Sequence, residues 1–528
     1  MKTLLYIVSF WTFLLLAACS SGDDGGDGDI DKPVQFTQRY NGNQSFYSKK
    51  LGQIIKYSVL LPSEYLSQDN SKFGVVYLLH GWGGDESSWG PSGMNIQSLV
   101  DTAEKTAGVR PLIYVMPQGF NSYFCNKYDG EFNYMDMITD ELIPMIDKQL
   151  RTTASSSERA IAGFSMGGFG ALTIASQHPE LFKVSIGLSP SLNSDEQYTT
   201  LSQDSWNLQW GTIFGGVGQT GNNRITSYYK SQCPLHFFAD KALSSFQDIR
   251  YFIDCGDDEE RLYVGNGELH ALMRDKGIKH EFRVRNGAHT EEYWRESMKE
   301  ALPFIESSFS AVDYSKETTH NFSANAHSYS KTIKVQNLDL ELWMPNDYNE
   351  SNSYKILYYS KGASETEVTA EQVAISLDSI MGIKKFVIAG FDAKEMKENG
   401  ISFAEICSFV QGVIHTDDLS SARLGLAYGS DADYLYKCTL GDTPQVSYFF
   451  AEDANVGTVT GNNSAKLYYL DITDNGTNYT SMFQLFCALR AQNSTVQYRV
   501  RNGISTTASA MTGIYSMSYF ISEQLIKK

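Results

Sequence analysis

A serine in a glycine-rich segment is the first group in the sequence that could serve as a nucleophile. Gly163-Phe164-Ser165-Met166-Gly167 matches the pattern G-x-S-x-G, with an apolar segment before it and small residues after it. At a sharp turn from a strand into a helix, this pattern pushes the serine hydroxyl outward, and small neighbours let the backbone pass. We therefore expect Ser165 to act as a catalytic nucleophile.

His289 is the residue that we expect to activate this serine. An alkyl hydroxyl is a weak nucleophile and needs a neighbouring base. In α/β-hydrolases the nucleophile, the acid and the histidine follow one another along the chain. His289 fits this order, because it lies in a glycine-containing loop after the last predicted strand of the first half. His80 comes too early in the chain for this role, and we expect it to brace its own loop.

The acid of such a triad is expected just after the apolar segment RYFIDCG at residues 250–256. Four acidic residues follow it directly, namely Asp257, Asp258, Glu259 and Glu260. The acid holds the imidazole in the required tautomer and stabilises the imidazolium. The residues alone leave the choice among the four open.

Backbone N–H groups are expected to stabilise the negative charge on the reacting oxygen. Such groups come from the residue after the nucleophile and from a loop at the end of an early strand. In this chain they belong to Met166 and, in the segment HGWGG, to Trp82. The sequence contains no C-x-x-C pair, and we expect neither a metal nor another cofactor.

Seven apolar segments in the first half are predicted strands that position these residues. Continuous apolar runs are typical of strands buried on both faces of a mostly parallel sheet. Helices are predicted between several of them, and this alternation indicates the α/β class. The predicted strands are 54–62, 74–84, 111–119, 159–163, 184–190, 250–256 and 280–287, and the predicted helices are 135–150, 167–182, 264–277 and 293–309.

The second half of the chain repeats the pattern of the first half. Several segments recur in the same order, among them FRVRNGAHT at 282–290 and YRVRNGIST at 498–506, which indicates an internal duplication. The second copy is shorter, and the missing residues fall in connections, where insertions over an active site usually lie. We predict a first domain at 36–312, a polar linker at 313–327 and a second domain at 328–528.

The second copy lacks the residues that the chemistry requires. Gly429 stands where the first copy has Ser165, and Ser505 stands where it has His289. The other matches are Ser360-Lys361 for His80-Gly81 and Asp474-Asn475-Gly476-Thr477 for the acidic cluster. Loss of the serine or the histidine of a triad lowers the rate by about 10⁶. We therefore expect a non-catalytic domain with a structural or interface role, with glycan binding as the alternative.

Four segments, LLHGWGGDESSW, GFSMGGFGAL, IDCG and GAHTEEYW, resemble the esterase D-like α/β-hydrolases of carbohydrate esterase family one. This group includes feruloyl esterases and acetyl xylan esterases. The resemblance implies an α/β-hydrolase fold, followed by a shorter degenerate copy, and hydrolysis of feruloyl or acetyl esters on plant cell-wall xylan or xylo-oligosaccharide. Members of the group place the acid three residues after the glycine, which points to Glu259, with Asp258 as the alternative.

The N-terminus has the features of an exported lipoprotein. An apolar run from Leu4 to Leu16 is short for a membrane span, and Leu16-Ala17-Ala18-Cys19 resembles a bacterial lipobox. We therefore expect residues 1–18 to be a signal peptide, Cys19 to carry the lipid and residues 19–35 to form a Gly/Asp tether. The mature protein would be anchored in the outer membrane and exposed at the cell surface.

The overall charge limits the class of partner. The formal net charge is −18, and an acidic chain repels the phosphates of nucleic acid, whereas a neutral polysaccharide is compatible with it.

Two other functions fit the sequence. One is a glycan-binding surface lipoprotein without catalysis, and the other is an esterase that acts on a different exported substrate, such as a siderophore ester. A homodimer is also compatible with the sequence.

Overall fold

The computed structural model describes most of the chain after the N-terminal segment. It covers residues 34–67, 70–314, 322, 329–361, 368–381, 386–416, 423–429, 432–441, 444–457 and 461–526. The predicted signal peptide, Cys19 and most of the predicted tether and linker lie outside these residues. Within the described part of the chain, no helix is long and apolar enough to cross a membrane.

Eight strands of the first half form a sheet in the order β1-β2-β4-β3-β5-β6-β7-β8. β1 and β2 are antiparallel, and the strands from β4 to β8 run parallel to one another. Every residue of the inner strands β3 to β6 is buried, as their continuous apolar sequences predicted. The predicted α/β class with a mostly parallel sheet is confirmed. The strands are β1 (Tyr40–Ser48), β2 (Gln53–Leu60), β3 (Gly74–Leu79), β4 (Leu112–Pro117), β5 (Arg159–Phe164), β6 (Val184–Leu188), β7 (Arg250–Gly256) and β8 (His280–Arg285).

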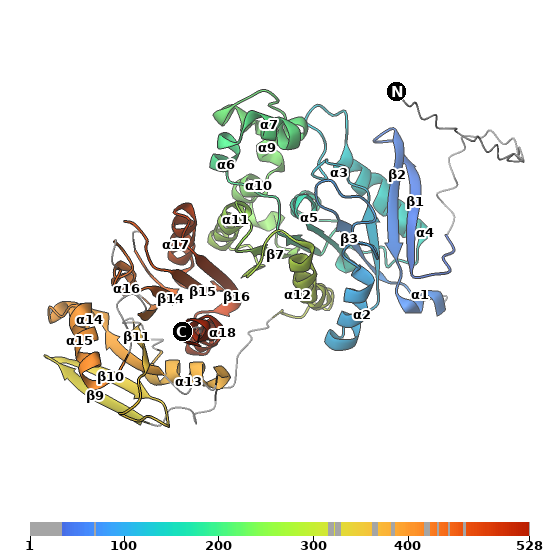
Figure 1. The fold of residues 1–528 in the computed structure, drawn as a ribbon. Helices are drawn as coiled ribbons and strands as arrows, with labels where there is room; N and C mark the ends of the chain where they lie inside the picture. Colours follow the sequence, from blue (N-terminus) through green and yellow to red (C-terminus); the bar gives the residue numbers. More distant parts are fainter. Residues whose placement is uncertain are drawn as a thin grey trace, which may run out of the picture.

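Helices cover both faces of this sheet (Figure 1). α2 and α12 share one apolar core with Val76 and Leu78 of β3, whereas α5 and α11 share another with Val75 and Tyr77, because alternate residues of a strand point to opposite faces. A group of short helices, α6 to α10, is inserted between β6 and β7; it was not predicted, nor were β1 and α2. The helices are α1 (Ser63–Ser67), α2 (Ile96–Ala107), α3 (Tyr134–Asp136), α4 (Ile143–Gln149), α5 (Met166–Gln177), α6 (Asp195–Thr200), α7 (Gln203–Trp206), α8 (Thr212–Phe214), α9 (Ser227–Gln232), α10 (Pro234–Asp240), α11 (Leu262–Lys276) and α12 (Glu291–Phe309).

The strands of the second half repeat this order, from β9 at the outer edge to β16, as β9-β10-β12-β11-β13-β14-β15-β16. The largest difference is in one connection, which spans residues 455–466 between β14 and β15 but 189–249 between β6 and β7. The strands are β9 (Tyr329–Val335), β10 (Leu338–Met344), β11 (Lys355–Lys361), β12 (Phe386–Asp392), β13 (Leu424–Gly429), β14 (Tyr448–Ala454), β15 (Leu467–Asn475) and β16 (Val496–Ile504). The helices are α13 (Ala370–Met381), α14 (Ala393–Glu398), α15 (Phe403–Val413), α16 (Ala432–Lys437), α17 (Tyr479–Ala491) and α18 (Thr507–Ile526).

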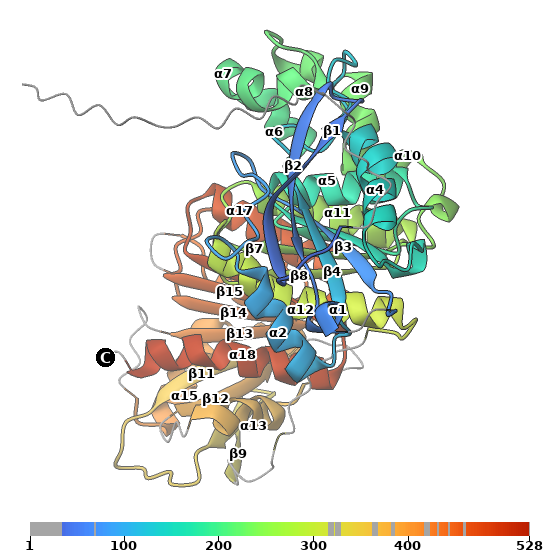
Figure 2. The same ribbon diagram turned by 90° about the vertical axis from the view of Figure 1, so that its right-hand side faces the viewer.

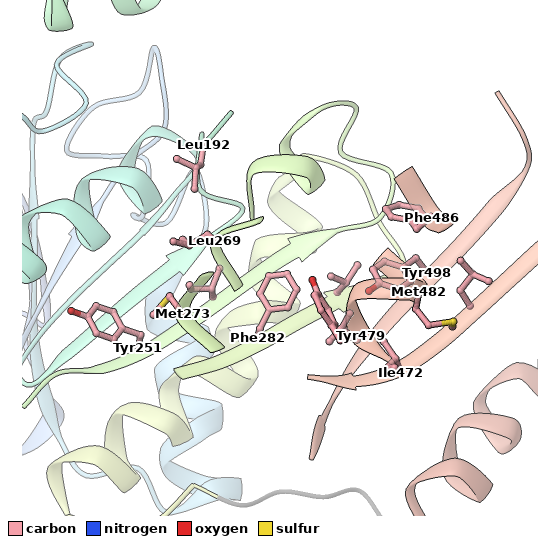
Figure 3. Close-up of a cluster of buried hydrophobic side chains, with 14 of the residues drawn as sticks. Leu192, Tyr251, Leu269, Met273, Phe282, Ile472, Tyr479, Met482, Phe486 and Tyr498 are labelled. Atoms are coloured by element: carbon pink, nitrogen blue, oxygen red, sulfur yellow. The ribbon is translucent and has the colours of Figure 1, made fainter. Parts of the chain in front are cut away.

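The two sheets join edge to edge (Figure 1, Figure 2). β8 pairs antiparallel with β16, with Val284 opposite Val500, so that the described strands form one 16-stranded sheet. On one face of this junction α11 and α17 meet, and side chains from both halves form a shared apolar core (Figure 3). Within it the rings of Phe282 and Tyr479 lie 6.4 Å apart. Elements β1 to α12 form the N-terminal unit, and elements β9 to α18 form the C-terminal unit.

Candidate active site

Ser165 lies in a sharp turn between β5 and α5. Its backbone angles, φ of 56° and ψ of −121°, are strained for a residue other than glycine. The chain on either side of it comes so close that a Cβ at Gly163 would meet the carbonyl oxygen of Gly167 at 2.3 Å. The turn therefore requires glycine at position 163, and it holds Ser165 at the end of a central strand, partly exposed to solvent.

His289 connects Ser165 to a carboxylate. Its Nε2 lies 2.8 Å from Ser165 Oγ, and its Nδ1 lies 2.9 Å from Glu259 Oε2. In this arrangement Nδ1–H donates to the carboxylate and Nε2 accepts from the hydroxyl. The three residues follow β5, β7 and β8, and parallel strands bring these three chain segments to one edge of the sheet. Trp294 of α12 packs edge-on against the imidazole, with ring centroids 4.8 Å apart, and so restricts its orientation.

Glu259 is held in place by several donors. Its side chain is fully buried. Oε1 accepts hydrogen bonds from the backbone N–H of Gly256 at 2.7 Å and from the hydroxyl of Ser189, which leaves Oε2 for His289. Ser189 in turn accepts from the indole N–H of Trp294 at 2.9 Å. One set of contacts therefore fixes both the carboxylate and the ring that packs on the histidine.

The other three acidic residues of this loop face elsewhere. Asp258 forms an ion pair with Arg490, and Asp257 forms one with Arg499 at 2.6 Å; both arginines belong to the C-terminal unit. Glu260 is exposed to solvent. Of the four acidic residues that follow β7, all within the described chain, Glu259 is therefore the one that contacts the histidine.

Both residues predicted for the oxyanion hole lie near Ser165. Trp82 lies in the loop after β3 and lines the same cavity as Ser165, while Met166 is the first residue of α5. The loop packs directly on the turn, since a Cβ at Gly81 would meet the Cβ of Ser165 at 3.4 Å. Free backbone N–H groups at a helix N-terminus favour negative charge at this point.

His80 braces the loop after β3, and this prediction is confirmed. Its Nε2 accepts the backbone N–H of Gly119 at 2.7 Å, so Nδ1 carries the proton and donates to the carbonyl oxygen of Gly81 at 2.7 Å. Burial lowers the pKa of His80 below its usual value, which keeps the ring neutral. The ring therefore links two loops through one hydrogen bond to each.

A cavity of about 860 Å³ opens over Ser165 and His289. Its walls include Trp82 from the loop after β3 and Gln209 and Trp210 from the insertion between β6 and β7. This volume is in the range of sites for small organic molecules. Within the described chain, no group of three or more His, Cys, Asp or Glu side chains could hold a metal ion.

Different residues stand at the equivalent strand ends of the C-terminal unit. Gly429, with a φ of 72°, ends β13 at the position that corresponds to Ser165. Ser505 follows β16, and its hydroxyl accepts the backbone N–H of Thr477 at 3.0 Å. The C-terminal unit therefore has no hydroxyl at the position of Ser165 and no imidazole at the position of His289.

Strand register corrects one of the predicted matches between the two halves. β3 pairs Leu79 with Gly163, and β11 pairs Ser360 with Ala427 at the same place in the second sheet. Ser360 therefore corresponds to Leu79 rather than to His80, and the predicted match was wrong by one residue. Two aligned apolar runs can slide by one position, whereas hydrogen bonds between strands fix their register.

Residues 48–305 match a family model described as a putative esterase. These residues, called the esterase domain below, belong to the esterase family. This chain is 34% identical over 147 residues to an endo-1,4-beta-xylanase/feruloyl esterase of Xylanibacter ruminicola, a match that covers 26% of this chain and 20% of that protein. It is 29% identical over 262 residues to esterase Rv1288 of Mycobacterium tuberculosis, over 46% of this chain and 54% of that protein. The chain thus spans about a fifth and about half of the lengths of these two relatives.

A solved structure of a ferulic acid esterase is also similar to this chain. The sequence identity is 24% and the TM-score is 0.44, over 51% of this chain and 100% of that chain.

Several residues that hold the site carry no signal in the sequence. Ser189 and Gln209 lie outside any motif, and their roles depend on contacts between distant segments. Arg499 lies in the repeated segment YRVRNGIST, but the repeat does not show that it reaches across the junction to the acidic loop. A contact between two units depends on their docking, which short motifs do not describe.

Proposed function

We propose that the esterase domain is a serine carboxylic-ester hydrolase with Ser165 as nucleophile, His289 as base and Glu259 as acid. The observation that carries this proposal is the continuous chain of hydrogen bonds from Ser165 Oγ through both nitrogens of His289 to a buried carboxylate. Such triads are recognised by their geometry and by the role of each group. Membership of residues 48–305 in the esterase family supports the same reaction.

Acylation begins when His289 Nε2 takes the proton from Ser165 as Oγ attacks the ester carbonyl. The negative charge that develops on the carbonyl oxygen is stabilised by the backbone N–H groups of Trp82 and Met166. His289 then gives its proton to the alcohol oxygen, the ester bond breaks, and the acyl group remains on Ser165.

Deacylation repeats these steps with water in place of the alcohol. His289 removes a proton from the water, which attacks the acyl-enzyme, and Ser165 leaves with that proton. Glu259 keeps Nδ1 protonated and stabilises the imidazolium in both halves of the reaction. Because Glu259 is fully buried, its charge acts on the ring with little screening by water.

The proposed substrates are feruloyl and acetyl esters of xylan or xylo-oligosaccharide. One relative of the domain carries the name endo-1,4-beta-xylanase/feruloyl esterase, which supports this substrate class. The cavity of about 860 Å³, with Trp82 and Trp210 in its walls, has room for an aromatic acyl group as well as for acetyl.

We further propose that the C-terminal unit does not hydrolyse esters. Gly429 supplies no nucleophile at the position of Ser165, and Ser505 supplies no base at the position of His289.

The lipobox-like sequence that ends at Cys19 supports a lipid-anchored protein on the outer membrane, exposed to polysaccharide outside the cell.

Replacement of the nucleophile tests the proposed reaction. We expect Ser165→Ala to lower kcat by about 10⁶ on methyl ferulate, an aryl acetate and acetylated xylan, with no change in the unfolding temperature. Ser505→Ala is the matched control, because it changes the residue of the C-terminal unit that corresponds to His289. We expect it to keep kcat within about twofold of the wild type.

Unchanged turnover by Ser165→Ala would contradict the proposal. If the wild-type protein binds xylo-oligosaccharide but hydrolyses none of these esters, the glycan-binding alternative is correct. The ratio of kcat/KM for methyl ferulate to that for the acetyl ester identifies the preferred acyl group.

A further inference from the structure

The loop that carries Glu259 is held by residues of the C-terminal unit. Arg499 of β16 donates from Nη1 to Asp257 Oδ2 at 2.6 Å, and the backbone N–H of Tyr498 donates to the same oxygen at 2.9 Å. The other oxygen, Oδ1, accepts the backbone N–H of Gly287 at 3.2 Å, two residues before His289. The fully buried carboxylate of Asp257 therefore connects the acidic loop, the histidine loop and the C-terminal unit.

A second arginine contacts the same loop. Arg490 of α17 donates from Nη2 to the carbonyl oxygen of Asp257 and to the carboxylate of Asp258. These are the two residues that come directly before Glu259. The backbone that positions the acid is therefore held in part from outside the esterase domain.

Equivalent contacts occur on the other side of the junction, where residues of the N-terminal unit donate to Asp474 of the C-terminal unit. Asp474 accepts from Arg283 Nη1 at 3.1 Å and from the backbone N–H of Phe282 at 3.4 Å through Oδ2, and from the backbone N–H of Gly503 at 2.9 Å through Oδ1. Each donor occupies the position in its repeat that its counterpart occupies around Asp257. The junction is therefore nearly two-fold symmetric, but only one of its two loops carries a triad.

We propose that Arg499 and Arg490 are positioning residues for ester hydrolysis: the C-terminal unit holds Glu259 and, through Asp257, the loop of His289 in their reactive places. This inference rests on the proposed function, because it assigns to the C-terminal unit a part in the reaction of the esterase domain. The partner that orders this active site is thus the second, non-catalytic copy of the fold in the same chain.

Burial makes the contact between Arg499 and Asp257 specific. The Arg499 side chain is 12% exposed and that of Asp257 is fully buried, and burial raises the pKa of Asp257 while Arg499 opposes that rise. Without the arginine, a buried carboxylate would have no cation, so it would take up a proton or move toward water. Either change alters the contact with Gly287 and shifts the two loops that meet at His289.

Kinetics of a matched pair of variants test this inference. We expect Arg499→Ala to lower kcat for an aryl acetate by about 10- to 100-fold with little change in KM, because small displacements of catalytic groups slow the reaction without removing the substrate site. Arg283→Ala is the control, since it removes the mirrored ion pair with Asp474, in which the side chains are 5% and 1% exposed. We expect it to reduce the unfolding temperature by a similar amount but to keep kcat within about twofold.

Rescue and a structural measurement complete the test. We expect Arg499→Lys, which keeps the positive charge but not the planar guanidinium over the ring of Tyr469, to recover part of the lost kcat. Hydrogen–deuterium exchange should rise at residues 257–262 and 286–290 in Arg499→Ala, but at 474–478 and 502–506 in Arg283→Ala. Equal losses of kcat in the two alanine variants, or unchanged exchange at 257–262 in Arg499→Ala, would overturn the inference.

A second pair keeps the test decisive if Arg499→Ala does not fold. Arg490→Ala removes the contacts to the acidic loop, and Arg274→Ala removes the opposite contact, in which Arg274 donates to the carbonyl oxygen of Gly476 at 3.1 Å. The same contrast in kcat and exchange is expected, and its absence would overturn the inference. If the wild-type protein has no esterase activity, the proposed function fails, yet exchange still shows whether the C-terminal unit holds the loop.

Discussion

At the scale of single residues, the surroundings of Glu259 determine which carboxylate serves the histidine. Gly256 and Ser189 occupy one oxygen and leave the other for His289. We predict that Glu259→Gln lowers kcat by about 10⁴, because the amide favours the wrong tautomer of the imidazole. The measurement is kcat on a chromogenic acetate ester, with circular dichroism to show that the fold is retained.

Asp258→Asn is the comparison for this prediction. The Asp258 carboxylate forms an ion pair with Arg490 and not with the histidine. We therefore expect kcat to fall by less than about tenfold, because a partly exposed ion pair contributes at most about 1 kcal/mol. A larger loss in Asp258→Asn than in Glu259→Gln would show that the acid had been assigned to the wrong residue.

The residues of the site differ in how far the sequence predicts them. Ser165 and His289 follow from a short motif and from chain order, because the sharp turn needs glycines and the strand order fixes where the histidine falls. The choice of Glu259 among four neighbouring acids rests on the resemblance to a family. The residues alone do not make that choice, because it depends on the hydroxyl of Ser189 and on the path of the loop.

At the scale of elements, α11 and β8 contribute two buried histidines to the junction. His270 Nδ1 lies 2.7 Å from His280 Nε2, and His270 Nε2 lies 2.8 Å from the carbonyl oxygen of Asp474 in the C-terminal unit. Burial lowers the pKa of His280 to about 4 and the pKa of His270 well below its usual value, and Arg274 and Arg283 act in the same direction. Both rings therefore resist protonation in the folded protein.

These pKa values predict a loss of stability in acid. Between pH of about 6.5 and about 4 the unfolded chain binds more protons at His280 than the folded chain does, so the contribution of His280 to the free energy of unfolding decreases as the pH falls through this range. We expect His280→Asn to be less sensitive to acid, so that the difference in unfolding temperature between wild type and variant changes with pH. Calorimetry across this range measures that difference.

Buried carboxylates with raised pKa values, such as Asp474 and Glu281, act in the opposite direction. They are present in both proteins, so the comparison with His280→Asn separates the histidine from them. Parallel curves of unfolding temperature against pH for the two proteins would contradict the prediction.

At the scale of the whole molecule, strand β8, at one edge of the first sheet, is already paired. β8 would present unpaired backbone groups to another chain, but β16 of the same chain covers it. We therefore predict a monomer, with a mass in light scattering close to that of one chain, which is 59.0 kDa for the full sequence. A mass near twice that value, stable on dilution, would contradict this prediction and support a homodimer.

The duplication is visible in the sequence, but the junction is not. Repeated segments such as the two VRNG sequences predict two copies of one fold, and the second sheet repeats the strand order of the first. The docking of β16 on β8 depends on Arg283, Arg499 and their carboxylates in pairs that cross between the copies. Within the sequence of one copy nothing distinguishes these residues from ordinary surface charges. Their pairing across the junction could therefore not be predicted.

Because both halves belong to one chain, each half can change its sequence independently of the other. Their association also does not depend on the protein concentration. In a homodimer every substitution occurs in both subunits, so a change that removes the nucleophile removes it twice. In a single chain, one half can lose its chemistry and keep its contacts. Because covalent linkage gives the second half a fixed effective concentration, the order that it provides to the active site does not weaken when the protein is dilute.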